Sequence, residues 1–593
     1  MNLDEAAVSR LSCLVVALVF VAGLLHLGVR LREVQVEGAA DYAYASARQS
    51  VRRVQVGGAR GRILDRNGAV LADNRVSLSI VCDAAQFQRR TWEATVEAIG
   101  EAVARVGEAI GRRPGIGLRE IRRHVRQTLP MPLVVWRDVD EDVLARFSER
   151  ARRFPGFSVE ETDERVYPQG RLAAHLLGYV GRDRGKSVAG DEKFSFFATE
   201  LAGRAGAETF FDSYLRGVPG ERRLLVDARG FTLRSWTVVE PQKGPDLRLT
   251  IDLALQREAE RQLEGLKGAC VAIDPDNGDV LALASAPGFD PNDFVPTLPQ
   301  TTYERFAKDP DVPLLNRATG GSYAPGSTFK PVTALAALGA GVPASETHLC
   351  AGEFRLGQMR LRCSNRWGHG ELDLCHALMK SCNPYFCELG MRVGTNALVR
   401  AARAFGLGSR TGIDFGVDEA GVVPDGAWKL AHHREKWFAG DLAQMSIGQG
   451  MLLVSPLQMA RLAGAIGTDF LVTPRLALGA PVERTRLPFA PEHLRTVRKG
   501  MRMVVNGDGM SQGTGWRGAE DVAAEVIGKT GTAEVGKGET RRNNTWFIAY
   551  AYAHGRALAV AMVIENGDSG GGTTAPRVAA VLRARFGSNT HLK

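Results

Sequence analysis

The chain has 593 residues, of which 45% are hydrophobic and 24% are charged, and its formal net charge is +9. This length is too great for one hydrophobic core, so we expect two or more domains. The composition excludes a disordered chain. The positive charge favours an acidic environment, such as anionic lipid or an acidic wall polymer. No compact Lys/Arg cluster with interleaved aromatic residues occurs, which argues against a nucleic-acid partner.

The first expected element is an apolar helix at residues 11–30, after a short tail at residues 1–10. The stretch from Leu11 to Val29 has no formal charge and is long enough to cross about 30 Å of hydrocarbon. A cleaved signal peptide is the alternative, because Ala43-Tyr44-Ala45 offers a small-residue pattern. That pattern lies far beyond the apolar run, which is also longer than a usual signal core. We therefore favour a retained transmembrane helix.

Residues 40–244 are predicted to form a mixed unit of strands and helices. Asn67-Gly68 between two short apolar runs is typical of a hairpin turn. Residues 90–150 have apolar positions every three or four residues, which predicts helices. A break at Pro241, Gly244 and Pro245 marks the expected domain boundary.

Residues 245–593 have strand patterns at both ends and a helix-rich middle at about 327–465. Asp252 can cap a helix that follows the alternating strand from Leu247 to Ile251. Hairpins are expected around Asn277-Gly278 and around His554-Gly555-Arg556, and a last helix from Pro576 to Phe586. This order predicts one α+β domain whose antiparallel sheet unites both ends of the segment and carries a helical subdomain.

The first candidate catalytic motif is Ser327-Thr328-Phe329-Lys330, followed by Pro331. Proline is tolerated only in the first turn of a helix, so Ser327 should lie near a helix N-terminus. The spacing of three residues then brings the Lys330 amine toward the Ser327 hydroxyl. A serine nucleophile needs a neighbouring base, and lysine can act as one if burial and nearby positive charge lower its pKa. The helix terminus could also stabilise an oxyanion.

Two further motifs follow in order along the chain. Ser381-Cys382-Asn383 places a hydroxyl and an amide two residues apart, where they could relay a proton and hold a substrate peptide group. Lys529-Thr530-Gly531-Thr532 is typical of an edge strand on which an extended peptide could pair, with Gly531 allowing close approach. We expect Lys529 to contact a substrate carboxylate and to help lower the pKa of Lys330.

These three motifs resemble those of penicillin-binding proteins and serine β-lactamases. The resemblance to class B penicillin-binding proteins covers most of the chain. Around Gly368-His369-Gly370 the sequence is more similar to elongation-type members than to division-type members. It departs from them at Asn383, where elongation-type members often have aspartate. Other segments that fit the family are Arg60–Gly68, Arg165–Pro168, Gly203–Glu208, Thr250-Ile251-Asp252, Asn316-Arg317 and Gly448-Gln449-Gly450.

The resemblance implies a cytoplasmic N-terminal tail and a single-pass anchor in the cytoplasmic (inner) membrane. It also implies a periplasmic body made of an elongated, non-catalytic pedestal of the dimerisation type at residues 40–244 and a transpeptidase domain at residues 245–593, with no glycosyltransferase domain. It also implies a polytopic glycosyltransferase of the shape, elongation, division and sporulation family as a partner, together with other elongation-complex proteins. Ser327, Lys330, Ser381, Asn383, Lys529 and Thr532 would be catalytic, Thr530, Gly531 and Thr532 would bind substrate, and the backbone N–H groups of Ser327 and Thr532 would form the oxyanion hole.

The expected reaction is cross-linking of peptidoglycan stem peptides, with β-lactam antibiotics as acylating mimics. A carboxypeptidase or β-lactamase-type hydrolase is the nearest alternative, but the sequence has no convincing glutamate motif for activating water. A non-catalytic β-lactam sensor or scaffold is the other alternative, against which the complete set of motif residues argues.

Five of the eight cysteines lie between Cys350 and Cys387. Cys350, Cys363, His369 and Cys382 are suitable ligands for a structural zinc ion, which would restrain the loop carrying Ser381 and Asn383. A disulfide, favoured by an oxidising compartment, and buried free thiols are the alternatives. The chemistry itself requires no cofactor.

Overall fold

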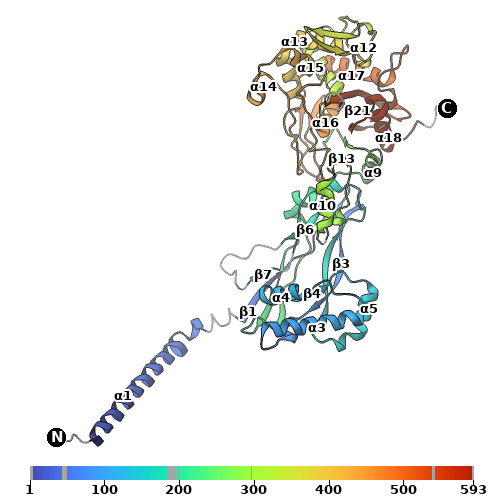
Figure 1. The fold of residues 1–593 in the computed structure, drawn as a ribbon. Helices are drawn as coiled ribbons and strands as arrows, with labels where there is room; N and C mark the ends of the chain where they lie inside the picture. Colours follow the sequence, from blue (N-terminus) through green and yellow to red (C-terminus); the bar gives the residue numbers. More distant parts are fainter. Residues whose placement is uncertain are drawn as a thin grey trace.

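The computed structural model describes residues 5–42, 50–183, 195–197, 200–295, 297–536 and 541–589. Ala43-Tyr44-Ala45, the pattern behind the signal-peptide alternative, lies outside these residues. Helix α1 (Glu5–Arg32) continues into a π-helical turn at Glu33–Glu37 and projects away from the rest of the molecule (Figure 1). The segment Ser12–Glu37 is long and apolar enough to cross a membrane, and none of its apolar window is buried. The expected N-terminal apolar helix is confirmed.

The pedestal consists of two sheets and a group of helices. The first sheet has the order β10-β9-β1-β7 and the second has the order β11-β2-β3-β4, with β5 also paired to β3. The bounds of the strands are β1 Val51–Val56, β2 Ile63–Leu64, β3 Val70–Cys82, β4 Leu133–Trp136, β5 Phe157–Val166, β7 Ser195–Phe197, β9 Gly220–Val226, β10 Thr232–Val239 and β11 Leu247–Arg248, and a small pair is formed by β6 Val180–Asp183 and β8 Glu200–Gly203.

Local sequence explains the pedestal helices α3 (Trp92–Ile110), α4 (Leu118–Gln127) and α5 (Glu141–Arg150). The Thr91 side chain caps α3 by accepting a hydrogen bond from the backbone N–H of Ala94, and Gly111 ends the helix in a left-handed conformation. The predicted helices between residues 90 and 150 are confirmed, but strand β4 interrupts them. The short helices α6 (Ala174–Leu177), α7 (Gly206–Phe210) and α8 (Asp212–Leu215) complete the pedestal.

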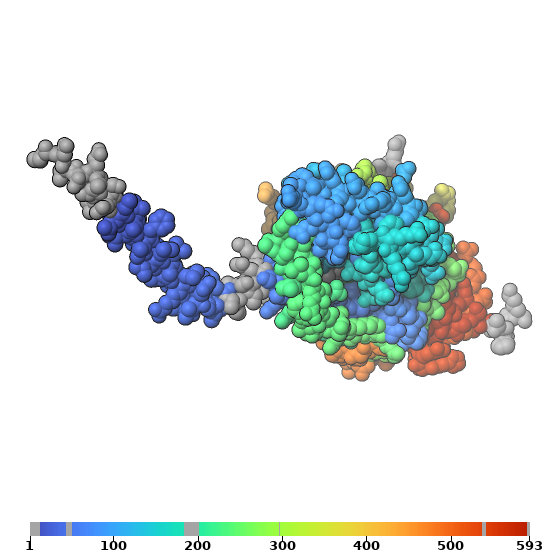
Figure 2. All heavy atoms as spheres, turned by 90° about the horizontal axis from the view of Figure 1, so that it is seen from below, coloured from blue at the N-terminus to red at the C-terminus, as the bar shows by residue number. Residues whose placement is uncertain are grey.

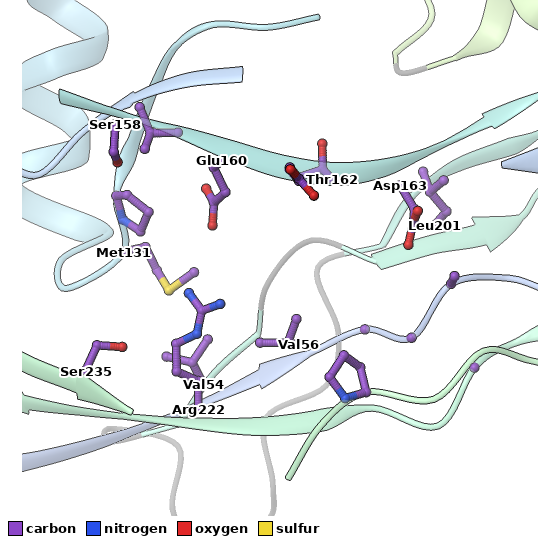
Figure 3. A pocket seen from close by; sticks show the side chains of 18 of the residues that line it. Val54, Val56, Met131, Ser158, Glu160, Thr162, Asp163, Leu201, Arg222 and Ser235 are labelled. Atoms are coloured by element: carbon purple, nitrogen blue, oxygen red, sulfur yellow. The ribbon is translucent and has the colours of Figure 1, made fainter. Parts of the chain in front are cut away.

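A cavity of about 740 Å³ opens between the two sheets of the pedestal. Glu160 on β5 and Arg222 on β9 point into it from opposite sides, with Met131 and Val54 also on its wall (Figure 3). All residues that line the cavity precede residue 242. This opening therefore belongs to the pedestal alone. In a view from below, the pedestal lies in front of the C-terminal domain and α1 projects to one side (Figure 2).

The C-terminal domain is built on a five-stranded antiparallel sheet with the order β13-β12-β22-β21-β20. Its strands are β12 Gly268–Ile273, β13 Val280–Ala286, β20 Glu525–Val535, β21 Arg542–Ala553 and β22 Arg556–Glu565. Both predicted hairpins are confirmed, and β12 pairs with β22, so the sheet unites the two ends of the domain. Strand β20 is an edge strand, as expected for the segment with Lys529.

Helices surround this sheet and fill the middle of the sequence. Asp252 caps α9 by accepting hydrogen bonds from Ala254 and Leu255, as predicted. The helices are α9 Leu253–Arg261, α10 Gln300–Lys308, α11 Lys330–Gly339, α12 Leu374–Met379, α13 Asn383–Ala404, α14 Gly426–His433, α15 Ala439–Ser446, α16 Pro456–Thr468, α17 Pro491–Asn506 and α18 Ala575–Phe586. Short strands accompany them at β14 His348–Cys350, β15 Glu353–Leu356, β16 Met359–Arg362, β17 Gly370–Leu372, β18 Phe470–Val472 and β19 Arg484–Arg486.

The pedestal and the C-terminal domain share one hydrophobic core where they meet. Ile63 and Tyr167 of the pedestal belong to the same buried cluster as Leu249 and Val271 of the following domain. Beside it, the fully buried Glu208 carboxylate binds Arg165 Nε at 2.6 Å and Arg60 Nη2 at 2.8 Å. The three pedestal motifs of the family therefore meet in one buried ionic cluster.

Candidate active site

Ser327 lies on a 3-10 turn, η5 (Gly326–Phe329), which leads directly into α11. Proline at the second position of α11 is consistent with the expected place of Ser327 at the start of a helix. The turn is fixed by the Gly326 N–H, which donates to Gly448 O at 2.8 Å, and by the Thr328 hydroxyl, which donates to Pro325 O at 2.6 Å. Within the described residues the Ser327 hydroxyl makes no hydrogen bond, so it is available to an incoming group.

Lys330 is completely buried, and its amine connects the first motif to the second. Lys330 Nζ donates to Asn383 Oδ1 at 2.7 Å and to the Ser381 carbonyl at 2.6 Å, and it lies 3.3 Å from Ser381 Oγ. Burial lowers the pKa of Lys330 from its usual value to about 8. A lysine with this pKa is neutral in a useful fraction of molecules near neutral pH, as a general base requires.

Ser381 occupies an unusual backbone conformation between α12 and α13, with φ of 54°. Serine rarely adopts a positive φ, so neighbouring contacts must hold it there. The Ser381 N–H donates to Leu378 O, and the Cys382 N–H donates to Ala377 O. Asn383 begins α13 and its Nδ2 donates to Arg362 O at 2.8 Å. These contacts fix the direction of both motif side chains.

Lys529 is buried rather than exposed to a ligand. Its Nζ donates to Ser381 Oγ at 2.9 Å and to Thr530 O at 3.0 Å. Burial, followed by the positive charge of Lys330, lowers the pKa of Lys529 well below its usual value. The structure therefore places the Lys529 amine against Ser381 Oγ, and its contact with a substrate carboxylate stays a prediction.

Edge strand β20 passes close to the Ser327 turn. A Cβ added at Gly531 would lie 2.9 Å from Pro325 O, and one added at Gly326 would lie 2.8 Å from Thr532 O. Only glycine permits this approach, which brings the backbones of Ser327 and Thr532 together. Gly531 thus serves contact between β20 and η5, in addition to its expected role toward a substrate.

The two threonines of the third motif differ in environment. Thr530 is 7% exposed, and its hydroxyl lies 3.0 Å from that of Thr514, so its side chain points into the protein. Thr532 is partly exposed, and its hydroxyl accepts a hydrogen bond from the Gly570 N–H at 3.4 Å. Gln449 Nε2 donates to Thr532 O at 3.4 Å. Thr532 is therefore better placed than Thr530 to contact a ligand with its side chain.

Sequence reasoning missed the supporting residues Thr514 and Gly570. Thr514 also donates to Met379 O at 3.2 Å, which joins the end of α12 to β20. A Cβ added at Gly570 would lie 2.5 Å from Gly531 O. The three consecutive glycines from Gly570 to Gly572 were the one available signal that the chain passes close to another backbone there.

The four predicted zinc ligands lie together beside the second motif. One ligand atom from each of Cys350, Cys363, His369 and Cys382 lies within 4.8 Å of the other three. His369 Nδ1 is 3.4 Å from Cys363 Sγ and 3.8 Å from Cys350 Sγ. All three cysteines are buried and carry free thiols. Tetrahedral zinc with sulfur and nitrogen ligands would place those atoms roughly 3.5–4 Å apart, so the donor set fits this metal.

Comparison with known proteins identifies both domains. The family profile described as "Penicillin binding protein transpeptidase domain" matches residues 268–583, and the profile "Penicillin-binding Protein dimerisation domain" matches residues 55–249. The peptidoglycan D,D-transpeptidase MrdA of Acinetobacter baumannii is 32% identical, and the alignment covers 92% of this chain and 83% of that protein.

Solved structures agree with these matches. The complex between penicillin-binding protein PBP2 and MreC from Helicobacter pylori contains a chain with a TM-score of 0.75 and 25% identity, covering 90% of this chain and 98% of that one. A structure described as the coordination of polymerization and crosslinking by a peptidoglycan synthase complex gives a TM-score of 0.71 at 29% identity, covering 98% and 99% of the two chains. The expected three-part α+β architecture is confirmed, and the chain belongs to the class B penicillin-binding proteins, within which it is similar to elongation-type members.

Proposed function

We propose that this chain is a peptidoglycan D,D-transpeptidase that cross-links stem peptides through an acyl-enzyme on Ser327. The observation that carries the proposal is the continuous row of contacts Lys529–Ser381–Lys330–Asn383, which unites the second and third motifs around the lysine of the first. Such a row can position and activate one nucleophile, because it supplies a buried amine of lowered pKa and a hydroxyl that bridges two amines.

In the first step the Ser327 oxygen attacks the penultimate D-alanine carbonyl carbon of a donor stem peptide, while neutral Lys330 takes the hydroxyl proton. The backbone N–H groups of Ser327 and Thr532 would stabilise the oxyanion that forms. As the peptide C–N bond breaks, the departing nitrogen receives a proton through Ser381, and free D-alanine leaves. Lys529 would act through Ser381, because it contacts that hydroxyl directly.

In the second step an amine of another stem peptide attacks the Ser327 ester. As the new amide bond forms, the attacking amine gives a proton to the lysine–serine relay, and the relay passes this proton to the departing Ser327 oxygen. Within the described residues, no carboxylate forms a hydrogen bond to Lys330, Ser381, Asn383 or Lys529. A hydrolase would need a base that activates water, so this arrangement favours transfer to an amine over hydrolysis.

The test is labelling of the full-length protein in detergent with a fluorescent penicillin, followed by mass mapping of the adduct. We expect one stable adduct on Ser327, lost in Ser327→Ala and retained in Ser409→Ala, which removes an exposed serine that belongs to none of the motifs. A donor–acceptor assay then separates cross-linking from hydrolysis by its products. A folded wild-type protein that gives no adduct would refute catalysis and favour the scaffold alternative, and rapid release of hydrolysed penicillin would favour a hydrolase.

We also propose that Cys350, Cys363, His369 and Cys382 hold a structural zinc ion. The ion would supply no chemistry to the reaction; it would restrain Cys382, which lies between the two polar residues of the second motif. The support is the close group of three thiols and one imidazole.

Metal analysis of protein purified without chelator should give about one zinc per chain, and Cys350→Ser should lower both the zinc content and the melting temperature. Cys375→Ser is the matched control, since Cys375 is also buried and carries a free thiol but is not part of the group. A wild-type protein without zinc and with a mass lower by two hydrogens would instead support a disulfide. No zinc and an unchanged mass would support free thiols.

We further propose that α1 anchors the chain once in the cytoplasmic membrane, with the body in the periplasm, and that the pedestal contacts proteins of the elongation complex, including a polytopic glycosyltransferase. The support is the exposed apolar helix and the similarity to proteins solved with MreC and in a peptidoglycan synthase complex. Protease added to intact spheroplasts should digest the body. Protection of the body would refute this orientation. Co-purification of the full-length protein with the glycosyltransferase from membranes that hold both proteins would support the contact, and its absence would refute it.

A further inference from the structure

A basic hairpin borders the candidate active site. Strands β15 and β16 pair in antiparallel register, with Arg355 opposite Arg360 and Glu353 opposite Arg362. Side chains alternate between the two faces of a strand, so these four residues share one face. Phe354 and Leu361 on the other face pack against the core. The exposed face therefore carries three arginines and one glutamate.

The charges on this face are not balanced within the protein. Glu353 forms its ion pair with Arg355. In the part of the chain that the structure describes, Arg360 and Arg362 form no ion pair, and both are exposed. Like charges directly opposite each other destabilise a hairpin. Arg355 stands opposite Arg360, but Glu353 offsets the charge of Arg355. The face therefore keeps the positive charges of Arg360 and Arg362, which can bind an anion from outside.

The loop that follows the hairpin adds another cation and an aromatic ring. Trp367 is 80% exposed, and the guanidinium carbon of Arg366 lies 4.4 Å from the centre of its ring. The Asn365 side chain fixes this loop, because it accepts a hydrogen bond from the Trp367 N–H at 3.1 Å and donates to Gly368 O at 2.5 Å. A large ring held on an ordered turn and stacked with a cation is typical of a recognition surface.

This surface is continuous with the catalytic residues. Arg362 is the last residue of β16, and its carbonyl accepts the hydrogen bond from Asn383 Nδ2. The contact row in the active site thus begins at Lys529 on β20 and ends at Arg362. If the donor peptide pairs with β20, the hairpin at the other end of the row stays exposed and open to a second substrate.

We propose that Arg360, Arg362 and Arg366 bind the carboxylates of the acceptor stem peptide and so place its amine near the Ser327 ester. This inference rests on the proposed transpeptidase function for its substrate, and it assigns a binding site to the second substrate. The arginines act in binding and orientation, and they take no part in proton transfer. Exposed guanidinium groups can form bidentate hydrogen bonds with carboxylates, which lysine cannot reproduce in the same geometry.

The test measures equilibrium binding of a fluorescent stem peptide with free carboxylates to the full-length protein, beside the same peptide with its carboxylates amidated. We expect the wild type to prefer the acidic peptide, and Arg360→Gln and Arg366→Gln each to weaken its binding about threefold to tenfold. Binding to the wild type should weaken with added salt, and the double variant should lose most of this dependence. Arg400→Gln, which removes another exposed arginine of the same domain, should behave as the wild type.

Penicillin labelling of the same proteins reports whether the catalytic centre is intact. Loss of peptide binding with labelling retained supports the proposal, and in the cross-linking assay it should raise the KM for the acceptor with little change in kcat. Equal affinity of the wild type and the double variant, or equal affinity for the acidic and amidated peptides, overturns it. Arginine-dependent binding by a wild type that fails to react with penicillin would refute the proposed function and leave the hairpin site standing.

Discussion

Replacing Glu208 by glutamine should destabilise the pedestal strongly. The carboxylate is fully buried and neutralises two buried arginines, Arg60 and Arg165. Arg60 keeps a second partner, since its Nη1 lies 2.8 Å from Asp212. Among the residues that the structure describes, Arg165 would keep only neutral acceptors, the Gly61 carbonyl at 2.8 Å and Asn74 Oδ1 at 3.3 Å. Removing one partner of a buried pair costs about 3–5 kcal/mol, because the other charge stays buried without compensation.

For a unit of the size of the pedestal, a loss of about 1 kcal/mol in the free energy of unfolding lowers the melting temperature by roughly 2–4 °C. Glu208→Gln should therefore lower the midpoint temperature of the transition that includes the pedestal by about 6–20 °C. Scanning calorimetry of the full-length protein measures it. Glu221→Gln is the control, because Glu221 pairs with Arg223 at the surface and should cost under about 1 kcal/mol. A Glu208→Gln protein that melts within about 2 °C of this control would show that the charge of Glu208 does not hold the cluster together.

Three further predictions concern the active site. The rate of acylation by penicillin should rise with pH through the pKa of Lys330, about 8, and then level off. Below this pKa most Lys330 side chains are ammonium ions, which cannot accept the Ser327 proton. An acylation rate that does not change with pH would contradict this role. Asn383→Asp places a carboxylate on Lys330 Nζ and should raise that pKa by about 1–3 units, moving the measured pH profile in the alkaline direction. Thr514→Val leaves the buried Thr530 hydroxyl without its present hydrogen-bond partner. Chemical denaturation should show that the domain is less stable by about 1–3 kcal/mol. An unchanged denaturation midpoint would argue that Thr530 finds another partner.

The sequence predicted those parts of the fold that local patterns determine. Asn67-Gly68 and Asn277-Gly278 mark turns that the structure contains, since few residues other than glycine and asparagine suit such backbone conformations. Strand β4 was missed because four residues between two helices give no periodicity to read. The division of the pedestal into two sheets with a cavity between them was also beyond reach, because it depends on pairings between strands far apart in sequence, such as β1 with β9.

The catalytic motifs were predictable because each is short and contiguous, but the direction of their side chains was not. The spacing of Ser327 and Lys330 suggested a direct contact, whereas Lys330 forms its hydrogen bonds with Ser381 and Asn383. The inward direction of Lys529 follows from its place on an edge strand packed against the Ser327 turn, which only the three-dimensional arrangement reveals. Thr514 has no motif of its own and is recognised only by its contacts.

The active site combines one very constrained side with one exposed side. Toward β20, two buried lysines share Ser381, and glycines at 326 and 531 bring backbones into contact, so little can move without loss of the arrangement. Toward β16, Asn383 connects the same row to a hairpin whose cations face solvent. A transferase needs both properties, because its nucleophile must be positioned before the first substrate binds, while the second substrate must reach an ester already formed. Asn383 belongs to both sides, because it contacts Lys330 and the Arg362 carbonyl, so a single substitution there should alter activation and acceptor use together.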